Sequence, residues 1–193
     1  MARPREFDPD TVLERAMTVF WSKGYEATSL DDLCEATQLN RSSLYSTFGD
    51  KRALFIQTID RYGDAAVAKV SVALSSPVPV REALAAFLDD TIEKIIAGPG
   101  RIGCFIGNCA AEFARHDREV ASRVLGNLAR IEAVFRGAFA GAKERGELPP
   151  DSDIDALARF FVASVQGLRL MGKTMTERDV LDDIARVMLR CVG

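Results

Sequence analysis

Apolar residues recur every three or four positions along the first third of the chain, which is the spacing of one face of an α-helix. This pattern predicts a first helix that starts after Asp8 and ends before Gly24, because an acidic cap followed by proline starts a helix and a glycine ends one. It predicts two short helices, over 30–36 and 41–48, and a long helix that begins at Asp50.

The rest of the chain continues this helical pattern. The alternation Val70-Ser71-Val72 is also compatible with a strand, but nothing nearby offers a hairpin partner, so we predict that the long helix continues through it. Five further helices are expected, over 80–97, 102–115, 117–145, 154–172 and 177–191. The sequence therefore predicts an all-α fold.

The last two predicted helices are apolar on two sides. Such a helix must be buried on both sides, and in a chain of 193 residues we expect a second copy of the protein to supply one of those burials. The alternative is a central helix inside a single core, and either apolar stripe can be the one that meets the partner. We assign the dimer interface to Phe161, Val165, Leu168, Leu181, Ile184 and Met188. The second stripe consists of Ala156, Phe160, Ala163, Leu170, Val180, Val187 and Cys191.

Composition and charge are those of an ordinary globular protein, with 48% hydrophobic and 27% charged residues. No uncharged stretch reaches the roughly 18 residues of a membrane-spanning helix, and the polar start lacks the apolar core of a signal peptide. We therefore expect a soluble, cytoplasmic protein.

Four cysteines without a CxxC pair predict neither a disulfide framework nor a zinc site, and no cofactor is predicted. The net charge of −3 gives no general affinity for nucleic acid.

The first three helices have the arrangement of a helix-turn-helix, with the tight connection Thr37-Gln38-Leu39 before a short third helix. Leu44 and Phe48 lie one turn apart and are expected to face inward, which leaves the small polar side chains of this helix for the major groove. Thr28 and Ser29 stand at a helix N-terminus suited to phosphate, and Lys51 begins the next helix. The predicted DNA contacts are therefore Thr28, Ser29, Arg41, Ser42, Ser43, Tyr45, Ser46 and Lys51.

Local charge supports this surface modestly. Arg41, Lys51 and Arg52 against Asp50 give the segment 38–52 a net charge of +2. Arg3 and Arg5, ahead of the first helix, could form an arm that enters a minor groove, but we favour a terminus that makes no such contact.

At these residues the chain closely resembles the DNA-binding domain of the TetR (tetracycline-repressor-like) family. The resemblance is carried by Phe20-x-x-x-Gly24-Tyr25-x-x-Thr28-Ser29-Leu30 and by the continuous stretch from Leu39 to Lys51. Order, spacing, the Leu-Tyr-x-x-Phe core and the following lysine all agree over about fifty residues. The helical remainder looks like the ligand-binding and dimerisation domain of the same family.

This resemblance implies a DNA-binding domain over 1–50 and a ligand-binding and dimerisation domain over 51–193, linked by the helix from Asp50. It implies a homodimeric repressor that binds a palindromic operator and releases it when a small-molecule inducer binds. Tyr45 and Lys51 would contact phosphates, and Arg41, Ser42 and Ser46 would lie near bases. Ser46 stands where the family often has histidine or another larger side chain, so base readout there is expected to be weaker or differently placed.

The second part of the chain offers two kinds of sensor. Phe87, Phe105, Phe113, Phe135 and Phe139 are predicted to line a ligand pocket, although phenylalanines at helical spacing are more often plain core. Alternatively, Cys104 or Cys109 could sense thiol-reactive compounds, and Arg101 would lower the pKa of Cys104. If both cysteines lie on one helix, five residues apart, their side chains point about 140° away from each other around the helix axis. The two thiols would then form no disulfide.

A metal site and an enzyme are the weaker alternatives. Cys109, Glu112 and His116 share a helix face, but the cysteine and the histidine are about two turns apart, too far to bind one ion alone. An all-α enzyme or carrier is the remaining alternative, but no GxSxG, GxxxxGK[ST] or HExxH motif is present. We therefore predict a regulator and not an enzyme.

Overall fold

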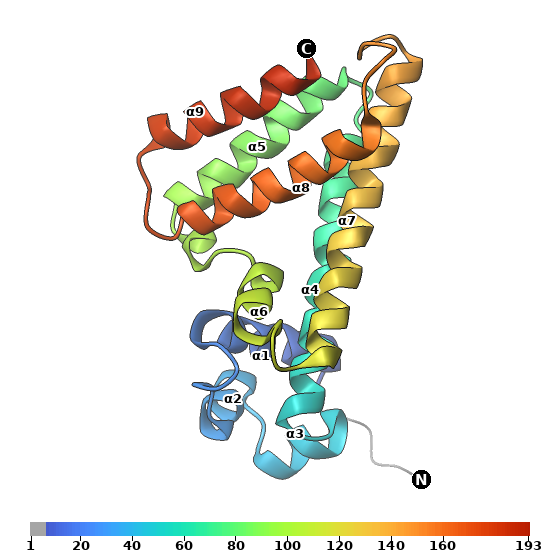
Figure 1. The fold of residues 1–193 in the computed structure, drawn as a ribbon. Helices are drawn as coiled ribbons and strands as arrows, with labels where there is room; N and C mark the ends of the chain where they lie inside the picture. Colours follow the sequence, from blue (N-terminus) through green and yellow to red (C-terminus); the bar gives the residue numbers. More distant parts are fainter. Residues whose placement is uncertain (1–6) are drawn as a thin grey trace.

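The computed structural model describes residues 7–193, and within them the chain is helical and contains no strand (Figure 1). Arg3 and Arg5 lie outside the described residues. The α-helices are α1 (Pro9–Lys23), α2 (Leu30–Thr37), α3 (Arg41–Phe48), α4 (Lys51–Leu74), α5 (Val80–Ile96), α6 (Phe105–Phe113), α7 (Arg118–Glu144), α8 (Ile154–Met171) and α9 (Arg178–Leu189). Two short 3₁₀ helices, η1 (Pro99–Ile102) and η2 (Arg190–Val192), complete the description. The predicted all-α fold class is confirmed, including the helix through Val70 to Val72.

Side-chain caps explain where the first four helices begin. Asp8 accepts hydrogen bonds from the amides of α1, and Asn40 and Asp50 do the same for α3 and α4. Ser29 and Asp32 form a reciprocal capping box at α2, in which each side chain accepts a hydrogen bond from the other residue's amide. These local signals made the starts of the helices predictable.

One helix start differs from the prediction and matters for the site. The helix expected over 102–115 begins only at Phe105, because Gly103 has a φ of 77° that interrupts it. Cys104 therefore caps α6 from an extended backbone and is not part of the same helix as Cys109. The helical angle that we predicted between the two thiols does not apply; both are buried and free.

The helix-turn-helix shares its core with the middle of the chain. Helices α1 to α3 pack around the first half of α4, at the end of the molecule opposite α5, α8 and α9 (Figure 1). Phe20 and Phe55 contact Phe105 and Phe113 of α6 in one buried aromatic cluster, either directly or through Tyr25. A division of the chain after residue 50 would cut through this core, so α6 and the helix-turn-helix are packed as one unit.

The second core lies between α5, α7, α8 and α9, with the end of α4 packed against it. Here the structure corrects our assignment of the dimer stripe. Phe161, Val165, Leu168, Leu181 and Met188 are all buried inside a single chain, and Ile184 is half-buried. The apolar stripe that faces outward is the second one, in which Phe160, Leu170 and Val187 are exposed by 39%, 66% and 56%. None of the helices within residues 7–193 is long and apolar enough to cross a bilayer.

Candidate nucleic-acid interface and cavity

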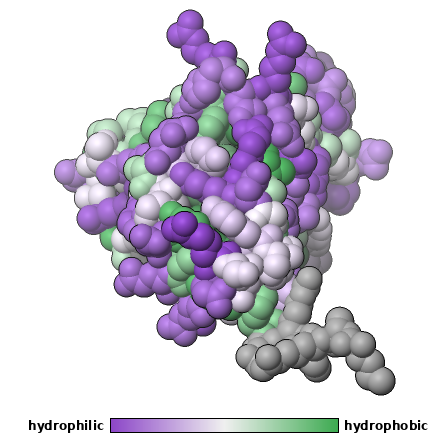
Figure 2. Space-filling model, turned by 90° about the horizontal axis from the view of Figure 1, so that it is seen from below, coloured by the Kyte–Doolittle hydropathy of each residue, from purple (hydrophilic) through white to green (hydrophobic). Residues whose placement is uncertain are grey.

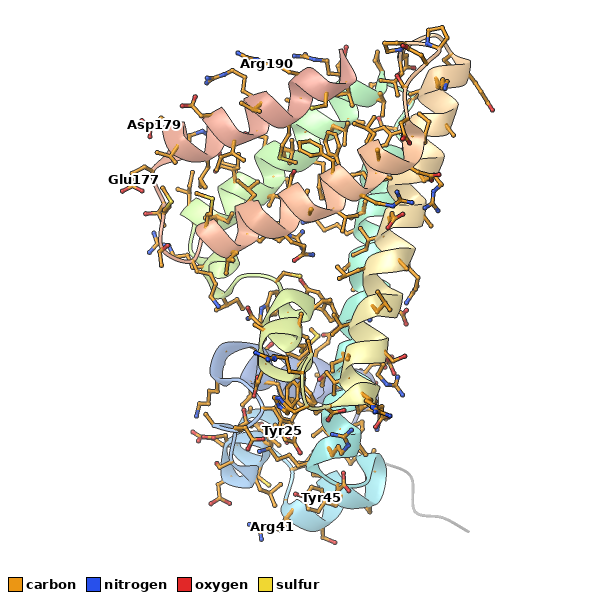
Figure 3. The ribbon with its side chains drawn as sticks, in the orientation of Figure 1. Tyr25, Arg41, Tyr45, Glu177, Asp179 and Arg190 are labelled. Atoms are coloured by element: carbon orange, nitrogen blue, oxygen red, sulfur yellow. The ribbon has the colours of Figure 1, made fainter. Side chains whose placement is uncertain are left out.

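Helix α3 presents a polar face at one end of the molecule. Leu44 and Phe48 are buried against α2 and α4, as predicted. Arg41, Ser42 and Ser46 are consequently exposed, and Ser43 and Tyr45 are half-exposed. Figure 3 shows Arg41 and Tyr45 at the tip of the molecule, and Figure 2 shows this end as hydrophilic residues around a paler, weakly polar area.

Arg41 is available to bind another molecule. Its side chain is 66% exposed, and its only ion pair among residues 7–193 is a long one, 3.7 Å from the Asp31 carboxylate. An exposed ion pair of this length contributes little, so a phosphate or guanine can replace it. The hydroxyl of Ser46 donates to the carbonyl oxygen of Ser43 and keeps its lone pairs as acceptors.

The start of α2 offers less than predicted. The Thr28 side chain is buried, and its hydroxyl donates to the carbonyl oxygen of Gly24 at 2.6 Å. The hydroxyl of Ser29 accepts from the amide of Asp32, which belongs to the capping box. A phosphate at this point would therefore meet backbone amides rather than the Thr28 hydroxyl, and the carboxylates of Asp31 and Asp32 stand beside it.

The cations at the start of α4 have different roles. The Lys51 ammonium lies 4.3 Å from the centre of the Tyr25 ring, which positions it without neutralising it. Arg52 instead binds the carboxylates of Asp117 and Glu119, at 2.5 and 2.9 Å. The hydrogen bond from Arg52 holds the pKa of Asp117 at about 2. Arg52 therefore ties α4 to the start of α7, and the local charge of +2 that we counted is partly neutralised.

Glu112 of α6 is a second tie to the helix-turn-helix. Its carboxylate accepts hydrogen bonds from the backbone amides of Tyr25 and Glu26, in the turn between α1 and α2, at 3.2 and 3.3 Å. This engagement removes Glu112 from the metal alternative with Cys109 and His116. Among residues 7–193, no group of three potential ligands is placed to hold a metal ion.

A cavity of about 320 Å³ lies among α1, α4, α5, α7 and α8. Of the predicted pocket residues, Phe87 and Phe135 line it. Phe105 and Phe113 belong to the aromatic cluster below it, and Phe139 packs against Phe135 and Phe161 in the second core. None of these three lines the cavity: Phe105 instead lines a second pocket, with Phe20, Phe55 and Glu112, and Phe113 and Phe139 are packed in the interior. Helical spacing does not distinguish a buried side chain at a cavity from one in a packed interior.

The polar lining of the cavity was missed by the sequence analysis. Lys69, Lys94, Gln166 and Arg169 line it, together with the aromatic side chains of Trp21 and Tyr62. One signal was available: Gln166 and Arg169 interrupt the apolar face of α8 one turn apart. Trp21 belongs to α1, so the helix-turn-helix itself forms part of the cavity wall.

Cys104 lies directly behind this wall. Its thiol accepts a hydrogen bond of 3.5 Å from the Tyr62 hydroxyl. Burial acts to raise the pKa of Cys104, but the charge of Arg169 and hydrogen bonds from Gly107, Tyr62 and Gln166 outweigh it and bring the pKa below its usual value. The relevant cation is therefore Arg169 rather than the predicted Arg101. In contrast, burial and the charge of Glu112 raise the pKa of Cys109 to about 12.

The chain matches two described protein families over most of its length. Residues 12–58 match "Bacterial regulatory proteins, tetR family", and residues 80–188 match "Tetracyclin repressor-like, C-terminal domain". It is 36% identical to the uncharacterized HTH-type transcriptional regulator YezE of Bacillus subtilis, over 98% of both chains. It is 33% identical to the HTH-type transcriptional repressor ComR of Escherichia coli, over 97% of this chain and 90% of ComR. A solved structure of a cysteine mutant of the regulator CifR, complexed with 26-base-pair operator DNA, superposes with a TM-score of 0.85 at 31% identity, covering 97% and 98% of the two chains.

Proposed function

Because this chain belongs to the TetR family of transcriptional regulators, we propose that it is a homodimeric repressor, released from a palindromic operator when a small molecule occupies the cavity. In this proposal residues 1–50 bind DNA and residues 51–193 bind the effector and the second subunit. A regulator of this family acts on DNA, so we propose that the protein works in the cytoplasm.

The exposed face of α3 supports the assignment of individual DNA contacts. We assign Arg41, Ser42 and Ser46 to base edges, since they are the most exposed side chains of this helix. Tyr45 and Lys51 are assigned to phosphates. This role fits Lys51 because the Tyr25 ring holds its ammonium in place without an acidic group. Ser43 and the N-terminal amides of α2, after Thr28 and Ser29, would complete the phosphate contacts.

The outward stripe of α8 and α9 is the face that we assign to the second subunit. Phe160, Leu170 and Val187 expose apolar surface that a monomer would leave in water. A dimer through this face carries two copies of α3, and successive major grooves require them to lie about 34–36 Å apart.

The observation that carries the ligand-release part is that Trp21 lines the cavity from within the helix-turn-helix. Gly103 lines the same cavity just before α6, and Glu112 near the end of α6 holds the turn between α1 and α2. A ligand that prefers a different arrangement of these elements would change the spacing of the two α3 helices. The ligand would then lower the affinity for the operator, by at most the ratio of the ligand's own affinities for the two arrangements.

We expect the protein to select one palindromic sequence from a library of genomic fragments. In fluorescence anisotropy it should bind this sequence at least about a thousandfold more tightly than a scrambled duplex, with specific binding losing less affinity between low and moderate salt than non-specific binding. The protein should be unfolded and refolded first, to remove any ligand retained during purification. Enrichment of no sequence, or equal binding to both duplexes, would argue against the proposal.

The position of Cys104 favours a second candidate, a regulator that senses thiol-reactive electrophiles. The lowered pKa of Cys104 increases its thiolate fraction at neutral pH. The Cys104 sulfur would attack an electrophilic carbon of the compound and form a carbon–sulfur bond beside the cavity wall. Cys109, with a pKa of about 12, stays protonated.

In a background in which Cys34→Ser and Cys191→Ser remove the accessible thiols, N-ethylmaleimide should modify Cys104 and release the operator. Because its pKa is lowered, the rate should level off at a lower pH than the rate of an ordinary thiol does. Mass spectrometry of the adduct identifies the residue. Cys104→Ser should abolish release and Cys109→Ser should not. The reverse result would exclude Cys104 as the sensor.

A further inference from the structure

The cavity gathers positive charge from three separate helices. Lys69 of α4, Lys94 of α5 and Arg169 of α8 all line it, and no acidic side chain is among its described lining residues. Asp90, just outside the lining, bridges the two lysines at 2.7 Å from each ammonium. One carboxylate for three cations leaves an excess of two positive charges at this site.

Arg169 is the cavity cation that no carboxylate neutralises within the described part of the chain. Across residues 7–193, no carboxylate lies within ion-pair distance of its guanidinium, although the side chain is only partly exposed. Its charge affects the titration of both Cys104 and Lys94, which places all three groups in one electrostatic neighbourhood. Burial is also the main cause that lowers the pKa of Lys69. Like charges held together in this way are stabilised when an anion binds between them.

Trp21 contributes its aromatic ring to the cavity wall. Its indole nitrogen is closed off from solvent, so this nitrogen does not face the open cavity.

Apart from Thr91 and Gln166, the lining beyond these cations is mostly apolar. It is formed by aliphatic and aromatic side chains, among them Val70, Phe87, Ile95, Ile131, Phe135, Val162 and Val165. The lysines are 41% and 50% exposed, so the charged part lies on the solvent side and the apolar part lies deeper. The volume of about 320 Å³ is at the lower end of the range for small-molecule sites, about 300–1,000 Å³.

We propose that the effector is a small amphiphilic anion, a carboxylate or sulfonate on an apolar body. Its acidic group pairs with Arg169, Lys94 and Lys69, and its body fills the apolar end of the cavity. This inference rests on the proposed function, because it names the ligand class of the cavity that we assign to the effector.

The test uses two dyes with the same aromatic body. 8-Anilino-1-naphthalenesulfonate carries the anion, and its uncharged parent N-phenyl-1-naphthylamine does not. Fluorescence titration of the full chain should show that Arg169→Gln and Lys94→Gln each weaken binding of the sulfonate by about tenfold or more and leave the neutral dye unchanged. Arg81→Gln, an exposed cation on the same helix as Lys94, is the matched control and should change neither affinity.

A fourth variant, Ala66→Phe, places a ring in the cavity and should weaken both dyes. Circular dichroism checks that every variant is folded. If both dyes respond to Ala66→Phe but the glutamine variants leave the sulfonate unaffected, the anion preference is wrong and the cavity stays the effector site. If neither dye responds to Ala66→Phe, neither occupies the cavity, and both the inference and the effector site of the proposed function fail.

Discussion

Phe161→Asp is expected to prevent the protein from folding. Phe161 is completely buried and packs against Phe135 and Phe139 in the second core. Loss of the ring costs about 3–5 kcal/mol, and burying an unpaired carboxylate adds to that cost. Since a domain of this size is stable by only about 5–15 kcal/mol, little or no folded protein should remain. Circular dichroism and thermal unfolding measure the loss directly.

The neighbouring substitution Phe160→Asp is the matched control and should have the opposite character. Phe160 is 39% exposed on the outward stripe of α8, so a carboxylate there remains in water in the free subunit. We expect a folded monomer in light scattering and at least about a hundredfold weaker operator binding, because the second half-site no longer contributes. An intact dimer with normal operator affinity would move the subunit interface to another face, and a folded Phe161→Asp protein would contradict the core described above.

Arg41→Ala is expected to lower operator affinity about 10- to 100-fold and to relax the preference at one base position in each half-site. The side chain is exposed and only loosely paired with Asp31, so it can bind guanine through two hydrogen bonds, a contact that discriminates by about 1–3 kcal/mol. Anisotropy on the selected operator and on duplexes with single base changes separates affinity from specificity.

Two further substitutions interpret that result. Tyr45→Phe should weaken binding to all duplexes alike, because a phosphate contact carries no base information. Arg15→Ala, which removes an exposed cation from α1, should change binding only slightly. If Arg41→Ala weakened all duplexes uniformly, Arg41 would be a phosphate contact and base readout would belong to the serines of α3.

The sequence by itself determined the starts of the first four helices and the exposed face of α3. Their caps act over three or four residues, as in the pairs Asp8–Thr11, Ser29–Asp32 and Asn40–Ser43. The inward direction of Leu44 and Phe48 follows from helical periodicity in the same way. Interactions of this range are readable because both partners stand within one turn of each other.

Tertiary structure decided everything that depends on partners distant in the chain. Arg52 is paired with Asp117, 65 residues away, so a count of local charge could not show that it is neutralised. Cys104 is influenced by Arg169 of α8, whereas sequence proximity had pointed to Arg101. Both stripes of α8 carry a phenylalanine in the sequence, and packing against α5 and α7 made Phe161 core and left Phe160 outside. The cavity cations come from three helices, and a charge pattern along one helix does not indicate which charges of other helices it will meet.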